Sequence, residues 1–190
     1  MLKLFGVTGV WALTDSELST SLTRVFAEEQ ALAAQRLALV REIDGRGLPS
    51  REGATSTIAW LRDTLRISVR TARQMVELAK ALDTNLSTTG QALADGVVNE
   101  EQALVIARAV GKLPADTQAK AEDFLLDKAA TFEPATLLTL GRRVLDTVAP
   151  ELADEQLAKD LKAADARAAR DRTLTLSPDG TGRVRLTGWL

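Results

Sequence analysis

Hydrophobic residues recur every three or four positions between residues 13 and 171, a spacing that predicts a run of amphipathic helices. The first predicted helix begins at a capping box formed by Thr14 and Glu17 and extends to about Asp44. With a rise of 1.5 Å per residue, it is about 45 Å long. Because that length exceeds what a small bundle can cover, we expect part of the helix to project or to pair with another chain.

One face of this predicted helix carries apolar residues at the spacing of a coiled coil. The positions of this face, which we call the seam, are Leu18, Leu22, Val25, Glu29, Leu32, Arg36, Leu39 and Ile43. Glu29 and Arg36 interrupt an otherwise apolar row. The sequence leaves two interpretations open: the seam packs within the chain, or it joins two copies into a homodimer.

Residues 55–82 predict a short helix, a three-residue turn at Arg66-Ile67-Ser68 and a second helix, for which Ser68 is the N-cap. The exposed side of the second helix is predicted to carry Arg70, Arg73, Gln74, Glu77 and Lys80. This is the layout of a helix-turn-helix reader of DNA. It is also common in all-α domains that bind no DNA, where such a face is only solvated.

The same pattern recurs weakly after Asn99. Aligning Ser68 with Asn99 superposes five apolar pairs: Ala72 on Ala103, Met75 on Ile106, Val76 on Ala107, Ala79 on Val110 and Leu82 on Leu113. The two copies differ in charge where the helix begins, because Arg70 of the first copy aligns with Glu101 of the second. Acids repel phosphate, so only the first copy is a candidate for DNA contact.

Three prolines, Pro114, Pro134 and Pro150, stand where further helices would begin. We expect Gly141 to allow the close approach of a neighbouring helix, and we expect the charged, alanine-rich helix at 151–171 to be mostly exposed. Beyond it, alternating apolar and polar residues on either side of a Ser-Pro-Asp-Gly-Thr-Gly turn predict a β-hairpin.

These patterns together predict a mainly α fold. It is expected to be a multi-helix bundle with two helix-turn-helix-like units, a long N-terminal helix and a C-terminal β-hairpin. The predicted organisation is a leader at 1–13, an all-α helical domain at 14–171 and a hairpin at 172–190 that begins a truncated segment. No apolar run approaches the roughly 18 residues that a membrane span needs, so we expect no membrane contact and a cytoplasmic location.

The composition argues against catalysis. The 190 residues include no His and no Cys, which excludes thiolate metal sites and His-based acid–base chemistry. The adjacent acidic pairs, such as Glu28-Glu29 and Glu100-Glu101, are better explained as solvated surface than as catalytic carboxylates. We therefore expect no enzyme activity, no catalytic residue, no metal and no cofactor in this chain.

The net charge of −2 means that any attraction to double-stranded DNA must come from a local patch. The candidate nucleic-acid-binding residues are Arg66, Ser68, Arg70, Thr71, Arg73 and Gln74. Arginine pairs with guanine and glutamine with adenine, while the two hydroxyl groups are suited to phosphate contact.

Four segments together carry a resemblance to a known family. They are LTDSELSTSL to EEQALAAQRLALV (13–40), ATSTIAWLRDTLRISVRTARQMVELAKAL (54–82), ALADGVVNEEQALVIARAVGKLP (92–114) and RTLTLSPDGTGRVRLTGWL (172–190). In this order they resemble the domain of unknown function family numbered 222, which is common in actinobacteria and their mobile elements. The resemblance covers nearly the whole chain.

In that family the domain usually precedes an HNH endonuclease module. The resemblance therefore implies a DNA-linked role, while nuclease activity cannot be carried over to a chain that lacks His and stops at Leu190. The leading hypothesis is a non-catalytic DNA-binding or targeting module of an HNH-endonuclease-type protein. The alternative is a protein-interaction or oligomerisation scaffold that uses the long first helix, and a third reading is an inert remnant of a longer nuclease.

Overall fold

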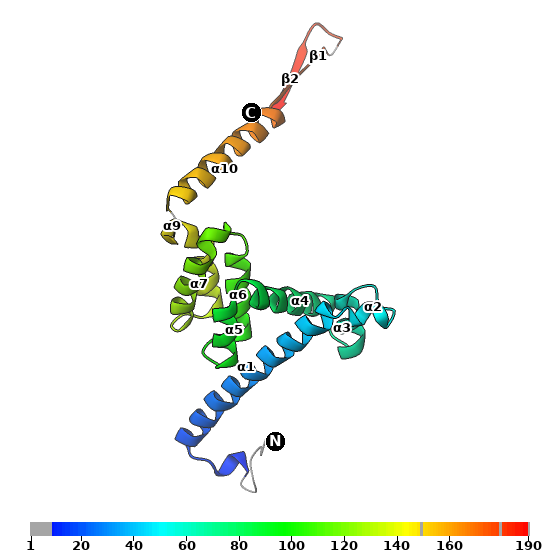
Figure 1. Cartoon of the computed structure of the whole chain (residues 1–190). Helices are drawn as coiled ribbons and strands as arrows, with labels where there is room; N and C mark the ends of the chain where they lie inside the picture. The colour runs from blue at the N-terminus through cyan, green and yellow to red at the C-terminus, as the bar shows by residue number, and fades with distance from the viewer. Residues whose placement is uncertain (1–8, 149, 179, 190) are drawn as a thin grey trace. The chain divides into compact units, whose positions relative to one another are not determined.

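The computed structural model describes residues 9–148, 150–178 and 180–189 (Figure 1). Residues Met1–Val144 form one compact unit and Leu145–Leu190 a second. The boundary between the two units precedes the last long helix, whereas the sequence placed a boundary after that helix. Most of the predicted leader lies outside the described residues, and its last part contains a short 3₁₀ turn, Val10–Ala12.

The first unit is built from α-helices, as predicted. Their bounds are α1 Asp15–Gly45, α2 Leu48–Arg51, α3 Thr57–Leu65, α4 Val69–Thr84, α5 Ser87–Ala94, α6 Glu100–Val110, α7 Ala115–Ala129 and α8 Pro134–Arg142. The short helix α2 follows Gly47, which adopts the left-handed conformation. The predicted capping box at Thr14 is present, with Glu17 Oε2 accepting a hydrogen bond of 2.8 Å from the Thr14 amide.

The core of this unit is made of small and aliphatic side chains. Leu37 of α1, Leu61 of α3, Ile106 of α6 and Leu125 of α7 are among the side chains that are almost wholly buried. The helix α4 packs against α1, α3, α5 and α6, so one face of it is sealed and the other remains in solvent. The first half of α1 extends beyond these helices (Figure 1).

The predicted repeat is present in the packing. Ala72, Met75 and Ala79 of α4 are buried, and so are their counterparts Ala103, Ile106 and Val110 of α6. Ser68 and Asn99 occupy equivalent N-cap positions, and each side chain accepts a hydrogen bond from the backbone three residues later. The two copies therefore share both their buried pattern and their start signal.

Buried polar side chains of neighbouring helices form hydrogen bonds with the ends of helices that have no side-chain cap of their own. The N-cap residue of α5, Leu86, has no capping side chain, and the Glu122 carboxylate of α7 accepts hydrogen bonds there from the amide (2.7 Å) and hydroxyl (2.8 Å) of Thr89. Gln102 of α6 donates to the backbone oxygens of Ala129 (2.7 Å) and Phe132 (2.9 Å). Each of these side chains thus provides a hydrogen-bond partner for backbone groups at the end of a neighbouring helix, which have no partner within that helix.

Gly141 lies buried in α8 against α6, as the sequence predicted. An ideal Cβ at this position would stand only 2.9 Å from the Cβ of Ala109. We expect Gly141→Ala to destabilise the fold by about 1–2 kcal/mol in urea unfolding, because the overlap outweighs the better helix propensity of alanine.

Ala109→Gly removes the opposing methyl group and provides the matched partner for this variant. In a double-mutant cycle it should recover most of the steric loss caused by Gly141→Ala. A Gly141→Ala protein as stable as the wild type would contradict the close approach.

The second unit contains the helices α9 Val144–Val148 and α10 Pro150–Asp171, followed by the predicted hairpin. The first residue of α9, Val144, still belongs to the first unit. The strands β1 Thr173–Pro178 and β2 Val184–Trp189 pair in antiparallel register, with Leu176 opposite Leu186. Leu161 of α10 is exposed, in agreement with the expectation for this helix. The side chains of Leu152 and Leu157, the other leucines of this helix, lie outside those that the structure describes.

Candidate nucleic-acid interface

The candidate interface is built from α3, a turn and the start of α4. Ser56 caps α3 by accepting the Ala59 amide at 3.1 Å, and Ser68 caps α4 by accepting the Thr71 amide at 3.0 Å. Between them Arg66 ends α3 in the left-handed conformation, with φ of 56°. A non-glycine residue pays about 1–2 kcal/mol for that conformation. The turn is as short as the sequence predicted.

The three candidate arginines are exposed. Arg66 lies in the turn, while Arg70 and Arg73 are three residues apart and share a face of α4. None of their guanidinium groups forms an ion pair or hydrogen bond with another residue that the structure describes. Their charges therefore stand in solvent uncompensated by a contacting acid.

The three polar candidates are placed differently. The hydroxyl groups of Ser68 and Thr71 lie 2.8 Å apart and are engaged with each other at the N-terminus of α4. Gln74 is half-buried and lines a hollow of about 200 Å³ together with Glu100 and Glu101. The structure thus places Gln74 beside the acidic start of α6 instead of in the open, which the sequence did not anticipate.

Two nearby basic residues are engaged in ion pairs. Arg62 contacts its neighbour Asp63 at 2.7 Å; this hydrogen bond raises the pKa of the Arg62 guanidinium and lowers the pKa of the Asp63 carboxyl. Arg36 Nη2 contacts Glu100 Oε2 at 2.6 Å. The Arg36 contact neutralises one of the two acids at the start of α6 and leaves Glu101 as the exposed one.

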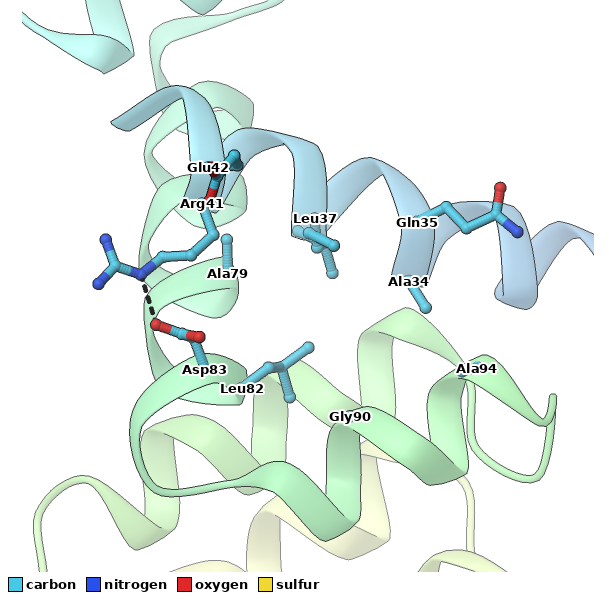
Figure 2. Close-up of a pocket in the computed structure, with 11 residues that line it drawn as sticks. Ala34, Gln35, Leu37, Arg41, Glu42, Ala79, Leu82, Asp83, Gly90 and Ala94 are labelled. Carbon is cyan, nitrogen blue, oxygen red and sulfur yellow. Dashed lines mark hydrogen bonds and ion pairs between the residues drawn. The ribbon is translucent and has the colours of Figure 1, made fainter. Parts of the chain in front are cut away.

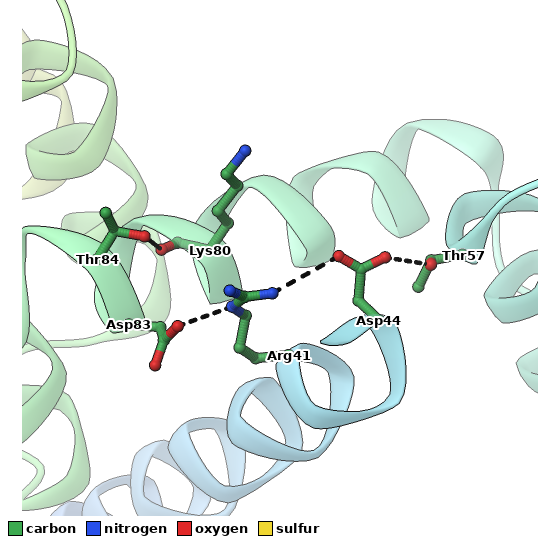
Figure 3. A network of polar contacts seen from close by, with 6 residues as sticks. All are labelled: Arg41, Asp44, Thr57, Lys80, Asp83 and Thr84. Atoms are coloured by element: carbon green, nitrogen blue, oxygen red, sulfur yellow. Dashed lines mark hydrogen bonds and ion pairs between the residues drawn. The ribbon is translucent and has the colours of Figure 1, made fainter. Parts of the chain in front are cut away.

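A network of polar contacts at the C-terminal end of α4 includes two further acidic residues, Asp44 and Asp83 (Figure 3). Arg41 of α1 contacts Asp83 at 2.8 Å and Asp44 at 3.8 Å, and Asp44 also accepts a hydrogen bond from the Thr57 hydroxyl. Lys80 is exposed in the same region, and its ammonium group points away from these acids in Figure 3. The network ties α1 to α3 and α4.

The exposed side of α4 consequently carries more positive than negative charge. Going along the helix, the charged residues of this side are Arg70, Arg73, Glu77 and Lys80, preceded by Arg66 in the turn. Glu77 is the one acid among them. This surface, which we call the α4 cationic face, contrasts with the start of α6, where Glu100 and Glu101 occupy the first turn.

Comparison with known proteins places this architecture in a family. The family model described as "Domain of unknown function (DUF222)" matches residues 19–190. The chain belongs to the DUF222 family. No curated protein and no solved structure matches this DUF222 chain.

The described part of this DUF222 chain also contains a groove between α1, α4 and α5, with a volume of about 530 Å³ (Figure 2). Small side chains line much of it, including Ala34, Ala38 and Ala94, and Gly90 adds bare backbone. Arg41 and Asp83 stand at one end, where they are bonded to each other. No sequence pattern predicts this groove, because its walls come from segments that lie far apart along the chain.

Among the described residues of this DUF222 chain, no group of three or more acidic, His or Cys side chains is arranged to hold a metal ion. None of the described helices combines the length and the apolar character needed to cross a membrane.

Proposed function

We propose that this DUF222 chain is a non-catalytic DNA-binding module that uses the α4 cationic face, and that it serves to target an HNH-endonuclease-type protein. The proposal rests chiefly on the exposed guanidinium groups of Arg66, Arg70 and Arg73, which have no acidic partner among the described residues. Such groups bind phosphate by releasing counterions and can pair with guanine edges. The link to an HNH module rests on the family resemblance.

The placement of the other candidates refines this role. The capping hydroxyls of Ser68 and Thr71 hold the first turn of α4 in place, so backbone amides at that helix start supplement the arginines in attracting phosphate. Gln74 lines a hollow beside Glu101, whose exposed carboxylate would repel a DNA backbone. We therefore assign phosphate and base contact mainly to the three arginines and helix positioning to the hydroxyl groups.

Removing two charges from the cationic face should weaken DNA binding and flatten its dependence on salt. For Arg70→Ala/Arg73→Ala, the plot of log binding constant against log salt should lose a slope of roughly 0.9 for each phosphate contact removed. Fluorescence anisotropy of a labelled duplex at several salt concentrations measures this change.

The matched control is Arg24→Ala/Arg46→Ala, which removes the same charge from exposed positions of α1 and its C-terminal end. It should leave the slope nearly unchanged. A second variant, Arg70→Lys/Arg73→Lys, should keep the slope and lose any preference for sequence, because lysine cannot form the bidentate contact. Equal slopes for the cationic-face and control variants would remove α4 from the interface.

A further inference from the structure

The long helix α1 has two separate apolar faces, and only one of them is covered. The covered face consists of Gln30, Ala33, Leu37 and Val40, which are buried against the bundle that includes α4 and α5. The seam residues Leu32, Arg36 and Leu39 each precede one of these positions by a single residue. They therefore lie about 100° around the helix from the covered face.

Six of the eight seam residues are exposed, and Val25 and Ile43 are half-buried. The most exposed apolar residues of the seam are Leu22 at 72%, Leu39 at 65% and Leu32 at 53%. Near its N-terminal end, Leu18, Leu22 and Val25 line an apolar hollow of about 410 Å³ together with Val10 and Leu13. Exposed apolar side chains gathered on one face of a helix in this way mark an interaction site.

The seam matches a second copy of itself when the two helices run in opposite directions. Reversing the row sets Leu18 opposite Ile43 and Leu22 opposite Leu39 of the other copy. The same reversal sets Val25 opposite Arg36 and Glu29 opposite Leu32. Apolar residues thus meet at both ends, and the two charged residues fall in neighbouring layers near the middle.

The charges distinguish this arrangement from a parallel one. In the antiparallel pair, Glu29 lies about 6 Å along the axis from Arg36 of the other copy, within reach of these long side chains. In a parallel pair, Glu29 would meet Glu29 and Arg36 would meet Arg36. Arg36 already donates through Nη2 to Glu100 of its own chain, and the guanidinium group has four further N–H donors.

We propose that the chain forms an antiparallel homodimer through the seam of α1. The occupant of this exposed face is a second copy of the chain, because reversal sets apolar residues opposite each other at both ends of the seam and brings Glu29 within reach of Arg36 of the other copy. This proposal does not depend on the cationic face of α4, so an experiment that disproves the dimer leaves the DNA-binding proposal intact, and the reverse also holds.

Sedimentation equilibrium of the whole chain tests the dimer. The wild type should dissociate with falling concentration, and Leu22→Asp should raise the dissociation constant by more than about a hundredfold, because a carboxylate would enter an apolar layer. Thr20→Asp adds the same charge to the other side of α1 and should leave the constant nearly unchanged. Circular dichroism checks that both variants keep the fold. A wild-type monomer at every concentration would overturn the proposal.

Cross-linking tests the direction, since the natural chain has no cysteine. A mixture of Leu22→Cys and Leu39→Cys chains should form a disulfide between the two variants under mild oxidation. Leu22→Cys alone and the surface control Thr20→Cys should remain largely uncross-linked. Efficient self-linkage of Leu22→Cys would show a parallel pair and overturn the antiparallel arrangement.

Discussion

Replacing Glu122 by alanine should lower the free energy of unfolding by about 3 kcal/mol, one of the two largest effects we expect in this chain. The Glu122 carboxylate is 5% exposed and accepts hydrogen bonds from the amide and the hydroxyl of Thr89. Without it, both donors are left unsatisfied in the core, and α5 loses the negative charge at its N-terminus. Urea unfolding followed by circular dichroism measures the loss.

Glu122→Gln is the matched control because it preserves an acceptor oxygen of the same shape. It should cost about 1 kcal/mol, since the hydrogen bonds are retained without the charge. If the alanine variant unfolds at the wild-type urea concentration, then Glu122 does not support α5 as described.

Gly96→Ala should produce the second large effect, a loss of about 2–4 kcal/mol. Gly96 follows α5 with φ of +69°, and a Cβ there would stand 2.8 Å from the Cβ of Ala27 and 3.1 Å from its backbone oxygen. The substitution therefore combines backbone strain with a collision against α1. Thermal and urea unfolding of the purified variant measure the total.

Gly47→Ala separates the two contributions. Gly47 has nearly the same backbone conformation, with φ of +62°, and its Cβ would meet nothing within 4 Å. This variant should therefore show the strain alone, about 1 kcal/mol. A Gly96→Ala protein that loses no more than Gly47→Ala would mean that α1 and the turn before α6 are not in close contact.

Features governed by local chemistry could be predicted from the sequence. The helix starts at Thr14, Ser68 and Asn99 depend on side chains that bond to amides three residues away. The hairpin turn was likewise predicted from its composition. Such signals involve only neighbouring residues, so they need no knowledge of the tertiary fold.

Features that depend on distant partners could not be predicted. Arg41 meets Asp83 across 42 residues, and Thr89 meets Glu122 across 33. No periodic pattern encodes which charged residue on one helix will meet which on another. The break between α8 and α9 at Arg143 has no signal in the sequence either, because the apolar spacing continues across it.

The candidate site shows the same division. The exposure of Arg70 and Arg73 followed from the helical period, which assigns them to the side opposite Ala72 and Met75. The half-burial of Gln74 beside Glu100 depends on how α6 packs against α4. A residue at the margin of a helical face therefore cannot be assigned to solvent or to a neighbour from the sequence alone.

The buried polar side chains of the bundle, Gln30, Gln102 and Glu122, also restrict how its helices can slide along one another. A core of interchangeable alanine and leucine side chains, with only 4% aromatic residues in the chain, would tolerate a shift of one helix by a turn at small cost. Such a slip would separate Gln30 from the Glu100 amide and Gln102 from the carbonyl groups at the end of α7. A misaligned packing would then leave buried polar atoms without hydrogen-bond partners. These few groups therefore select a single alignment of the helices, which the aliphatic side chains alone do not specify.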